Sequence, residues 1–131
     1  MNRSIKFRVY AKTDSGPKMV YLDPLQCDNG LWFSSKEHID NYDGKVMEFI
    51  GLQDKNGRDI YESDIVRVSE YNPVSEKYEE SLAIICWRYC GFVTIHPKNL
   101  DEKWCGGSEI CDTAGLEVVG NIFENSNLIN L

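Results

Sequence analysis

The chain has 131 residues, which is enough for one domain and too short for two of ordinary size. Its apolar share of 42% and charged share of 27% are those of an ordinary soluble globular protein, and its aromatic share of 11% favours a packed core over disorder. The 14 basic and 21 acidic side chains give a net charge of −7 without a basic stripe, which argues against a protein that neutralises nucleic-acid phosphates.

Short apolar segments recur between turn signals along the chain, which is the pattern of a β-rich domain. The segments that predict strands are, in chain order, 5–10, 18–22, 31–34, 46–50, 65–68, 82–87, 92–95 and 116–122. The first two form a predicted hairpin around a turn at residues 14–17, and 82–87 is apolar on both faces, as expected of a central, covered strand.

The remaining segments are predicted to lie outside strands. They are a polar loop at 36–43, one helical turn at 59–64, an exposed mobile loop at 70–80, a long irregular stretch at 96–114 and a short helical turn capped by Asn125 or Ser126. No segment has the length and 3.6-residue period of an ordinary helix. The expected fold is therefore an all-β, rolled or barrel-like antiparallel β-domain with a few helical turns, in a single domain over residues 1–131.

Four segments of the sequence carry a resemblance to a known family. They are 5–10 with 18–21, the long segment 47–68, the apolar strand at 84–87, and 117–125 near the C-terminus. In this order, and over nearly the whole chain, they resemble the YopX family. One departure lies in Tyr61-Glu-Ser-Asp64, where the family pattern usually has glycine at the position of Ser63. A positive φ at Ser63 costs about 1 kcal/mol, so this turn is expected to relax.

The resemblance implies an all-β fold and an origin in a phage or prophage, and hence a bacterial host cell. It implies no catalytic activity and no cofactor.

The long segment predicts a structural corner formed by Asp54, Asn56, Gly57, Tyr61 and Asp64. Asn-Gly is the strongest short-range hairpin signal, because both residues tolerate positive φ. Asp54 is expected to bond the turn amides, Tyr61 to pack under the turn, and Asp64 to cap the next strand. The alternative interpretation is a ligand-binding loop. The structural interpretation is favoured, because turn geometry alone explains residues of these types.

The spacing of acidic residues and cysteines bears on two possible metal sites, one for calcium and one for zinc. A calcium loop that starts at Asp54 would place Asp59 at its sixth position and Ile65 at its twelfth, where glycine and glutamate are needed. Zinc prefers pairs two to four residues apart. Cys86 and Cys90 have that spacing, but Cys105 and Cys111 do not, so no metal or cofactor is predicted.

The predicted function is a non-catalytic module that binds another macromolecule, most simply a protein, because no catalytic constellation is visible. The aromatic residues are expected in the core, and they are Trp32, Phe33, Tyr42, Tyr61, Trp87, Tyr89 and Phe92. Trp104 is the exception, because it lies in a glycine-rich loop and is a candidate for contact with a partner.

Two alternatives stay open. One is a nucleic-acid-binding β-domain, whose basic face would combine Lys6, Arg8, Lys12, Lys18 and Arg67, although Lys6, Arg8 and Lys12 also fit the solvated face of a strand. The other is a small enzyme that uses His96 or a reactive cysteine.

The compartment follows from absences in the sequence. No apolar run reaches the 18 residues of a membrane span, and the N-terminus has no apolar signal region. Five cysteines, an odd number, are then most simply reduced thiols in a cytoplasmic protein. A small barrel with long loops leaves an edge strand open, so a homo-oligomer is predicted.

Overall fold

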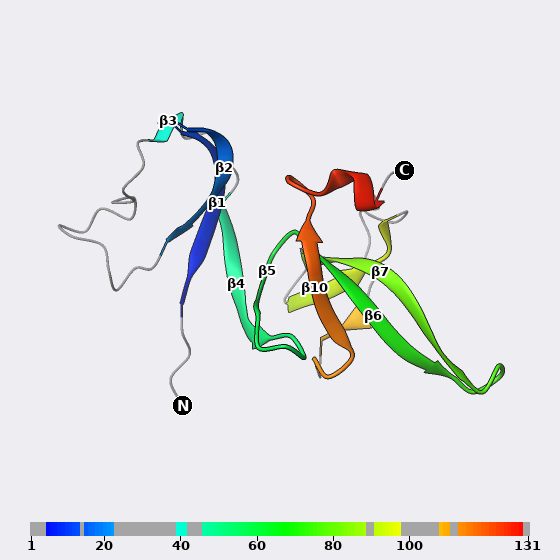
Figure 1. The fold of residues 1–131 in the computed structure, drawn as a ribbon. Helices are drawn as coiled ribbons and strands as arrows, with labels where there is room; N and C mark the ends of the chain where they lie inside the picture. The colour runs from blue at the N-terminus through cyan, green and yellow to red at the C-terminus, as the bar shows by residue number, and fades with distance from the viewer. Residues whose placement is uncertain are drawn as a thin grey trace. The chain divides into compact units, whose positions relative to one another are not determined.

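The computed structural model describes residues 5–13, 15–22, 39–41, 46–88, 91–97, 108–110 and 113–129. The chain divides into two compact units, Met1–Gly51 and Leu52–Leu131 (Figure 1). Among the described residues, none of the helices has the length and apolar character needed to cross a membrane.

The first unit is built on a hairpin of two strands, β1 (Phe7–Thr13) and β2 (Gly16–Leu22). Their antiparallel register runs from Phe7↔Leu22 to Thr13↔Gly16, so the predicted hairpin is confirmed. Strand β4 (Val46–Gln53) pairs with the other edge of β1. The short strand β3 (Ile39–Asn41) pairs with the last residues of β1. Within this unit the sheet order is β2-β1-β4, with β3 beside β1.

Along the first part of β1 both faces of the sheet are covered, since Arg8 and Val9 point to opposite sides and both are buried. Val9, Ala11 and Val20 form one apolar cluster, against which Phe7 packs. Arg8 points to the opposite face from Val9, and only 2% of it is exposed. The prediction that Arg8 lies on a solvated face is therefore wrong. Alternation along β1 shows which residues share a face of the strand, but it does not show whether that face is covered.

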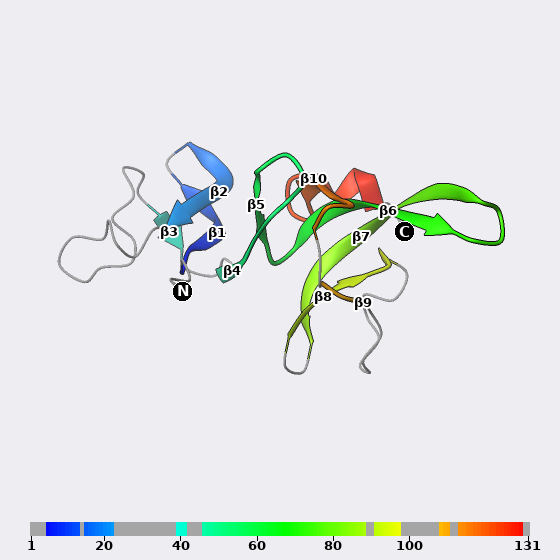
Figure 2. The same cartoon turned by 90° about the horizontal axis from the view of Figure 1, so that it is seen from below.

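Among its described residues, the second unit contains the remaining strands and a short 3-10 helix near the C-terminus. They are β5 (Asp59–Tyr61), β6 (Asp64–Asn72), β7 (Lys77–Arg88), β8 (Gly91–Ile95), β9 (Ser108–Glu109), β10 (Leu116–Asn121) and the 3-10 helix η4 (Ser126–Ile129). Its sheet has the order β10-β6-β7-β8-β9, with antiparallel pairs throughout. It curls into a half-barrel (Figure 2), so the predicted all-β, rolled fold is confirmed.

The core of the second unit lies on the central strands of this sheet. Ile65 and Val66 of β6 are fully buried, and Ile84 and Ile85 of β7 are each only 1% exposed. Because neighbouring residues of one strand point to opposite faces, burial of both means that this part of the sheet is covered on both sides. This agrees with the prediction of a central strand at 82–87.

Besides residues 70–80, which contain the end of β6 and the start of β7, three segments predicted as loop or helical turn contain strands. The polar segment 36–43 contains β3, and the stretch 96–114 contains β9. Both strands are three residues long or less and gain their pairing from distant residues, which no local pattern reveals. Residues 59–61 form β5 by pairing with β4, and Ser63 just after it has a φ of +69°, outside the range of a right-handed helical turn. Near the C-terminus, the predicted helical turn is present as η4.

Candidate functional site

The turn that joins β4 to β5 is organised by the carboxylate of Asp54. Its Oδ1 accepts hydrogen bonds from the backbone amides of Asn56 and Arg58, both 2.9 Å long. The backbone adds two bonds, from the Asp54 amide to the Arg58 carbonyl (2.8 Å) and from the Gly57 amide to the Asp54 carbonyl (3.0 Å). Gly57 has a φ of +82°, in the left-handed region that favours glycine.

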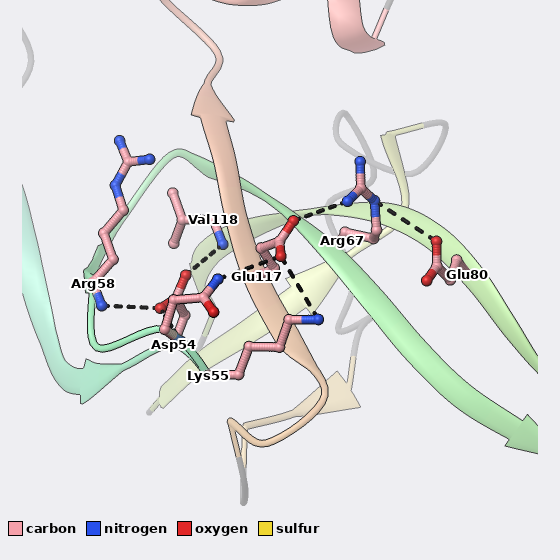
Figure 3. Close-up of polar contacts among 8 residues, drawn as sticks. Asp54, Lys55, Arg58, Arg67, Glu80, Glu117 and Val118 are labelled. Atoms are coloured by element: carbon pink, nitrogen blue, oxygen red, sulfur yellow. Dashed lines mark hydrogen bonds and ion pairs between the residues drawn. The ribbon is translucent and has the colours of Figure 1, made fainter.

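The same carboxylate attaches this turn to β10. Oδ2 of Asp54 accepts a 2.8 Å hydrogen bond from the Val118 amide (Figure 3). The Lys55 amide also donates to the Leu116 carbonyl, at 3.0 Å. Burial acts to raise the pKa of Asp54, but hydrogen bonds from the Val118, Arg58 and Asn56 amides and the charge of Arg58 outweigh it and lower the pKa. Asp54 is therefore held ionised by backbone donors.

A second tight turn follows directly, at residues 61–64. Oδ2 of Asp64 accepts a 2.8 Å hydrogen bond from the Tyr61 amide, and both residues are buried. Ser63 between them keeps a positive φ, so the expectation that this turn relaxes is wrong. The backbone explains why: the Ser63 amide donates to the Ile85 carbonyl (2.8 Å), and the Ser63 carbonyl accepts from the Ile122 amide (3.0 Å).

A third turn, after β10, is held by two asparagines. Oδ1 of Asn121 accepts hydrogen bonds from the amides of Phe123 (3.0 Å) and Glu124 (2.9 Å), and Oδ1 of Asn125 accepts from the Asn121 amide at 3.1 Å. Asn125 thus folds back onto β10 and does not use its side chain to cap η4. Gly120 allows this approach, because a Cβ there would lie 2.5 Å from Oδ1 of Asn125.

The three turns connect segments that are far apart in the sequence and that carry the family resemblance. The turn at Asp54 contacts β10, and the turn at Ser63 contacts both β7 and the residue after β10. The carboxylate oxygens of Asp54 and one oxygen of Asp64 already accept backbone amides. These contacts support the structural interpretation of the corner.

Outside this corner, a row of ion pairs crosses the surface of the second unit (Figure 3). Glu117 of β10 accepts from Arg67 at 2.9 Å and lies 3.6 Å from the Lys55 ammonium, and Arg67 lies 3.8 Å from Glu80. Asn56 also donates to Glu117, at 3.3 Å. The side chains of Arg67 and Glu80 are 45% and 64% exposed, so water screens these pairs and each stabilises the fold by only about 0–1 kcal/mol.

The most prominent surface feature is a projecting hairpin, which was predicted as a loop at 70–80. Strands β6 and β7 stay paired to their common tip, with Glu70↔Glu79, Tyr71↔Tyr78 and Asn72↔Lys77 as the last pairs. We call residues 70–79 the arm. The loop prediction is wrong. Proline inside a strand would remove a hydrogen bond between strands, but Pro73 lies in the connecting turn and leaves the pairing of β6 and β7 intact.

The arm extends away from the rest of its sheet in both views (Figures 1 and 2). Strand β10 pairs with β6 only as far as Val68, and β8 pairs with β7 only from Ile84 onward. Among the described residues, no third strand lies beside the arm. Oδ1 of Asn72 accepts the Val74 amide at 2.9 Å and so orders the turn at the tip.

Three large side chains of the arm are turned to solvent. The exposed fraction is 54% for Tyr71, 73% for Tyr78 and 92% for Val74. The two tyrosine rings contact each other edge to face, with centroids 5.4 Å apart. Sequence reasoning missed this site, although one signal was present: Asn72-Pro73 favours a turn, and two tyrosines flank that turn at matching positions.

Two of the residues proposed for catalysis, His96 and Cys86, lie in the part of the chain that the structure describes. His96 is exposed just after β8, and Cys86 is half-buried on β7. Burial raises the pKa of the Cys86 thiol, an effect that nearby Arg88 opposes and Glu62 reinforces, so the reactive thiolate is disfavoured there. Trp104, with Cys90, Cys105 and Cys111, lies outside the described residues.

The aromatic and basic candidates divide in a similar way. Tyr61 is buried as predicted, whereas Trp87 is 49% exposed and packs edge to face on half-buried Phe92, so its assignment to the core is wrong. The other predicted core aromatics, Trp32, Phe33, Tyr42 and Tyr89, lie outside the described residues.

The proposed basic face loses two of its members. Arg8 is buried, and Arg67 is engaged by Glu117 and Glu80. Lys6 lies over the Phe49 ring, 5.1 Å from its centroid. Lys18 is half-buried, and the side chain of Lys12 is not among those described. These contacts weaken the case for a phosphate-binding surface.

Comparison with known proteins identifies similar sequences and folds. The family model described as YopX protein matches residues 6–130, nearly the whole chain, so the predicted resemblance is confirmed. No curated protein matches the sequence. Among solved structures, the crystal structure of protein EF1440 from Enterococcus faecalis is similar, with a TM-score of 0.55 and 23% sequence identity over 98% of this chain and 99% of that one. At this identity the likeness concerns the fold alone.

Proposed function

The chain belongs to the YopX family, and on that premise we propose that it is a non-catalytic accessory protein of a phage or prophage, which acts in the bacterial cytoplasm by binding another protein. The observation that carries the proposal is the arm, residues 70–79, with Tyr71, Val74 and Tyr78 exposed at its end.

The exposure of these side chains is costly for a protein that works alone. An isolated two-stranded hairpin is marginally stable, and this one presents apolar surface to water with no third strand beside it among the described residues. Tyrosine is among the residues that contribute most to binding at protein interfaces, because it buries a large rigid surface and keeps a hydroxyl for hydrogen bonding. A projecting tip of this kind fits a partner that encloses it.

Self-association is a separate proposal. Strand β2 ends the order of its sheet, and among the described residues it pairs only with β1. An open edge of this type can pair with the same edge of a second copy. Sedimentation at several protein concentrations tests it, and a 15.0 kDa species at all of them would exclude it.

The proposed function can be tested by site-specific cross-linking in the host cell. A photoreactive phenylalanine derivative at position 74 is expected to trap a specific protein, because this position is the most exposed apolar one on the arm. The same derivative at position 128, a 39% exposed leucine outside the arm, serves as the matched control and is expected to trap none of it.

The adduct should disappear when Tyr71→Ala and Tyr78→Ala are added to the position 74 variant. Identical adducts from positions 74 and 128, or none from either, would contradict the proposal. Turnover of a substrate by the purified protein, abolished by replacing His96 or a cysteine, would show that it is an enzyme instead.

A further inference from the structure

We propose that the arm binds a basic surface of the partner protein, with an arginine or lysine of the partner between the carboxylates of Glu70 and Glu79. Tyr71, Val74 and Tyr78 then pack against apolar residues of the same partner surface. This inference rests on the proposed function and names the chemistry of the partner.

The ladder of the arm separates its apolar and acidic residues onto two faces. Tyr71 and Tyr78 are directly opposite each other, and so are Glu70 and Glu79 one position further from the tip. Because successive residues of a strand point to opposite sides, the tyrosine pair occupies one face and the glutamate pair the other. A partner that encloses the arm therefore meets a ring pair on one side and, on the other, two carboxylates with Lys77 two positions nearer the tip.

The glutamate pair is an unusual choice for a two-stranded hairpin. Like charges directly opposite in an antiparallel ladder destabilise it, and both side chains are exposed. Glu79 is partly oriented, since its Oε1 accepts from Nδ2 of Asn72 at 3.0 Å and from Oγ of Ser75 at 3.3 Å. A shallow hollow lies at this place, lined by Glu70, Tyr71, Asn72, Pro73, Glu79, Glu80 and Ser81. A cationic side chain placed there would offset the repulsion.

The charge of the whole arm points to the same occupant. It carries Glu70, Glu76 and Glu79 against the single cation Lys77, so its net charge is −2. Nucleic-acid phosphates would be repelled by this surface, and the arm of a second copy would bring like charges together. Guanidinium groups bind carboxylates with two parallel hydrogen bonds and also stack on aromatic rings, so arginine matches both faces of the arm.

The experiment uses the full chain and random 12-residue peptides made by messenger-RNA display. Peptides that bind the immobilised protein are expected to be enriched in arginine or lysine together with apolar residues. A synthetic copy of an enriched peptide should lose about tenfold or more in affinity when Glu70→Lys is introduced or when Tyr71 and Tyr78 are both changed to alanine. Its affinity should also fall as salt concentration rises.

Two variants outside the arm are matched controls for charge and apolar surface. Glu124→Lys makes the same charge change as Glu70→Lys on an exposed residue beyond β10, and Leu128→Ala truncates an exposed apolar side chain of η4. Both are expected to leave affinity within about twofold of the wild type, as surface changes away from an interface usually do. Melting temperatures recorded for every variant separate lost binding from lost folding.

Each result decides between the two proposals. Neutral or acidic peptides that still require Tyr71 and Tyr78 would overturn the basic partner and leave the proposed function intact. Peptides that bind regardless of the arm variants, or no enrichment at all, would overturn both. A dimer abolished by Tyr71→Ala with Tyr78→Ala would make a second copy the occupant, and arm-dependent binding of an oligonucleotide would make it a nucleic acid.

Discussion

The backbone amide of Val118 donates a 2.8 Å hydrogen bond to Oδ2 of Asp54, which lies 64 positions earlier in the chain. The other oxygen of the same carboxylate accepts the amides of Asn56 and Arg58. One buried side chain therefore orders the turn between β4 and β5 and also attaches that turn to β10. This contact brings together the long segment and the C-terminal segment that carry the family resemblance.

Replacement of Asp54 by asparagine should destabilise the protein. Asparagine has the same shape, but its NH₂ group would face a backbone donor and leave at least one buried amide without an acceptor, at a cost of about 1–3 kcal/mol. Urea unfolding measures the change. Glu76→Gln is the control, because it also replaces a carboxylate by an amide, on an exposed residue, and its effect should stay within about 0.5 kcal/mol. Equal effects would contradict the prediction.

The contribution of Asp54 should also depend on pH in a defined direction. Because its pKa is lowered in the folded protein from an ordinary value of 3.8, its contribution is fully present above pH 3.8 and is lost as pH falls through the folded-state pKa. The difference in unfolding free energy between wild type and Asp54→Asn should therefore be constant near neutral pH and shrink in acid. A difference that grows on acidification would show that the pKa is raised instead.

Gly57→Val should lower stability through the backbone alone. A Cβ at this position would meet no atom within 4 Å, so no clash is involved, but a β-branched residue at a φ of +82° is strained by about 1–3 kcal/mol. Gly57→Asn is the matched variant, since asparagine tolerates positive φ, and it should cost much less. If valine and asparagine melt at the same temperature, while binding of the cross-linked partner disappears with valine, the turn is a recognition loop.

Ser63→Gly should stabilise the protein. Ser63 is held at a φ of +69° by hydrogen bonds to Ile85 and Ile122. Glycine would relieve this strain and so stabilise the folded protein by about 1–2 kcal/mol. The greater freedom of glycine in the unfolded chain would offset about 0.4–1 kcal/mol of that gain. Thermal melting should show a small increase. A lower melting temperature would mean that the serine side chain contributes an interaction that outweighs the strain.

Gly120→Ala should be strongly destabilising, and Asn125→Gly should suppress the effect. The added methyl group would lie 2.5 Å from Oδ1 and 2.8 Å from Cβ of Asn125, so the turn must shift, at about 1–3 kcal/mol. Asn125→Gly removes both atoms. The double variant should therefore cost less than the sum of the single ones in a mutant cycle. Additive costs would show that Gly120 is needed for another reason.

Glu70→Lys should leave the arm intact or strengthen it. Lysine opposite Glu79 exchanges a repulsive cross-strand pair for an attractive one, which is worth roughly 0.2–1 kcal/mol. Protection of the Tyr71 and Tyr78 amides against hydrogen exchange measures this locally. Lower protection than in the wild type would mean that the two carboxylates do not repel each other, and would remove one support for the basic partner.

Local sequence chemistry determined the class of the fold. Alternation with a period of two residues predicted the hairpin at 5–22 and the strand at 116–122, and Asn56-Gly57 predicted the turn after β4, because these signals act between residues a few positions apart. The residue pattern also identified the family and the side chains of the corner around Asp54.

Only the tertiary structure decided which of these segments meet and which side chains stay exposed. Strand β3, the burial of Arg8 and the bond from Val118 to Asp54 depend on residues distant in sequence, and the polar composition of residues 70–80 hid a hairpin whose register places Tyr71 opposite Tyr78. Periodicity reports which residues share a face of a strand, but burial of that face is a property of what packs against it, and that is set by contacts between distant parts of the chain.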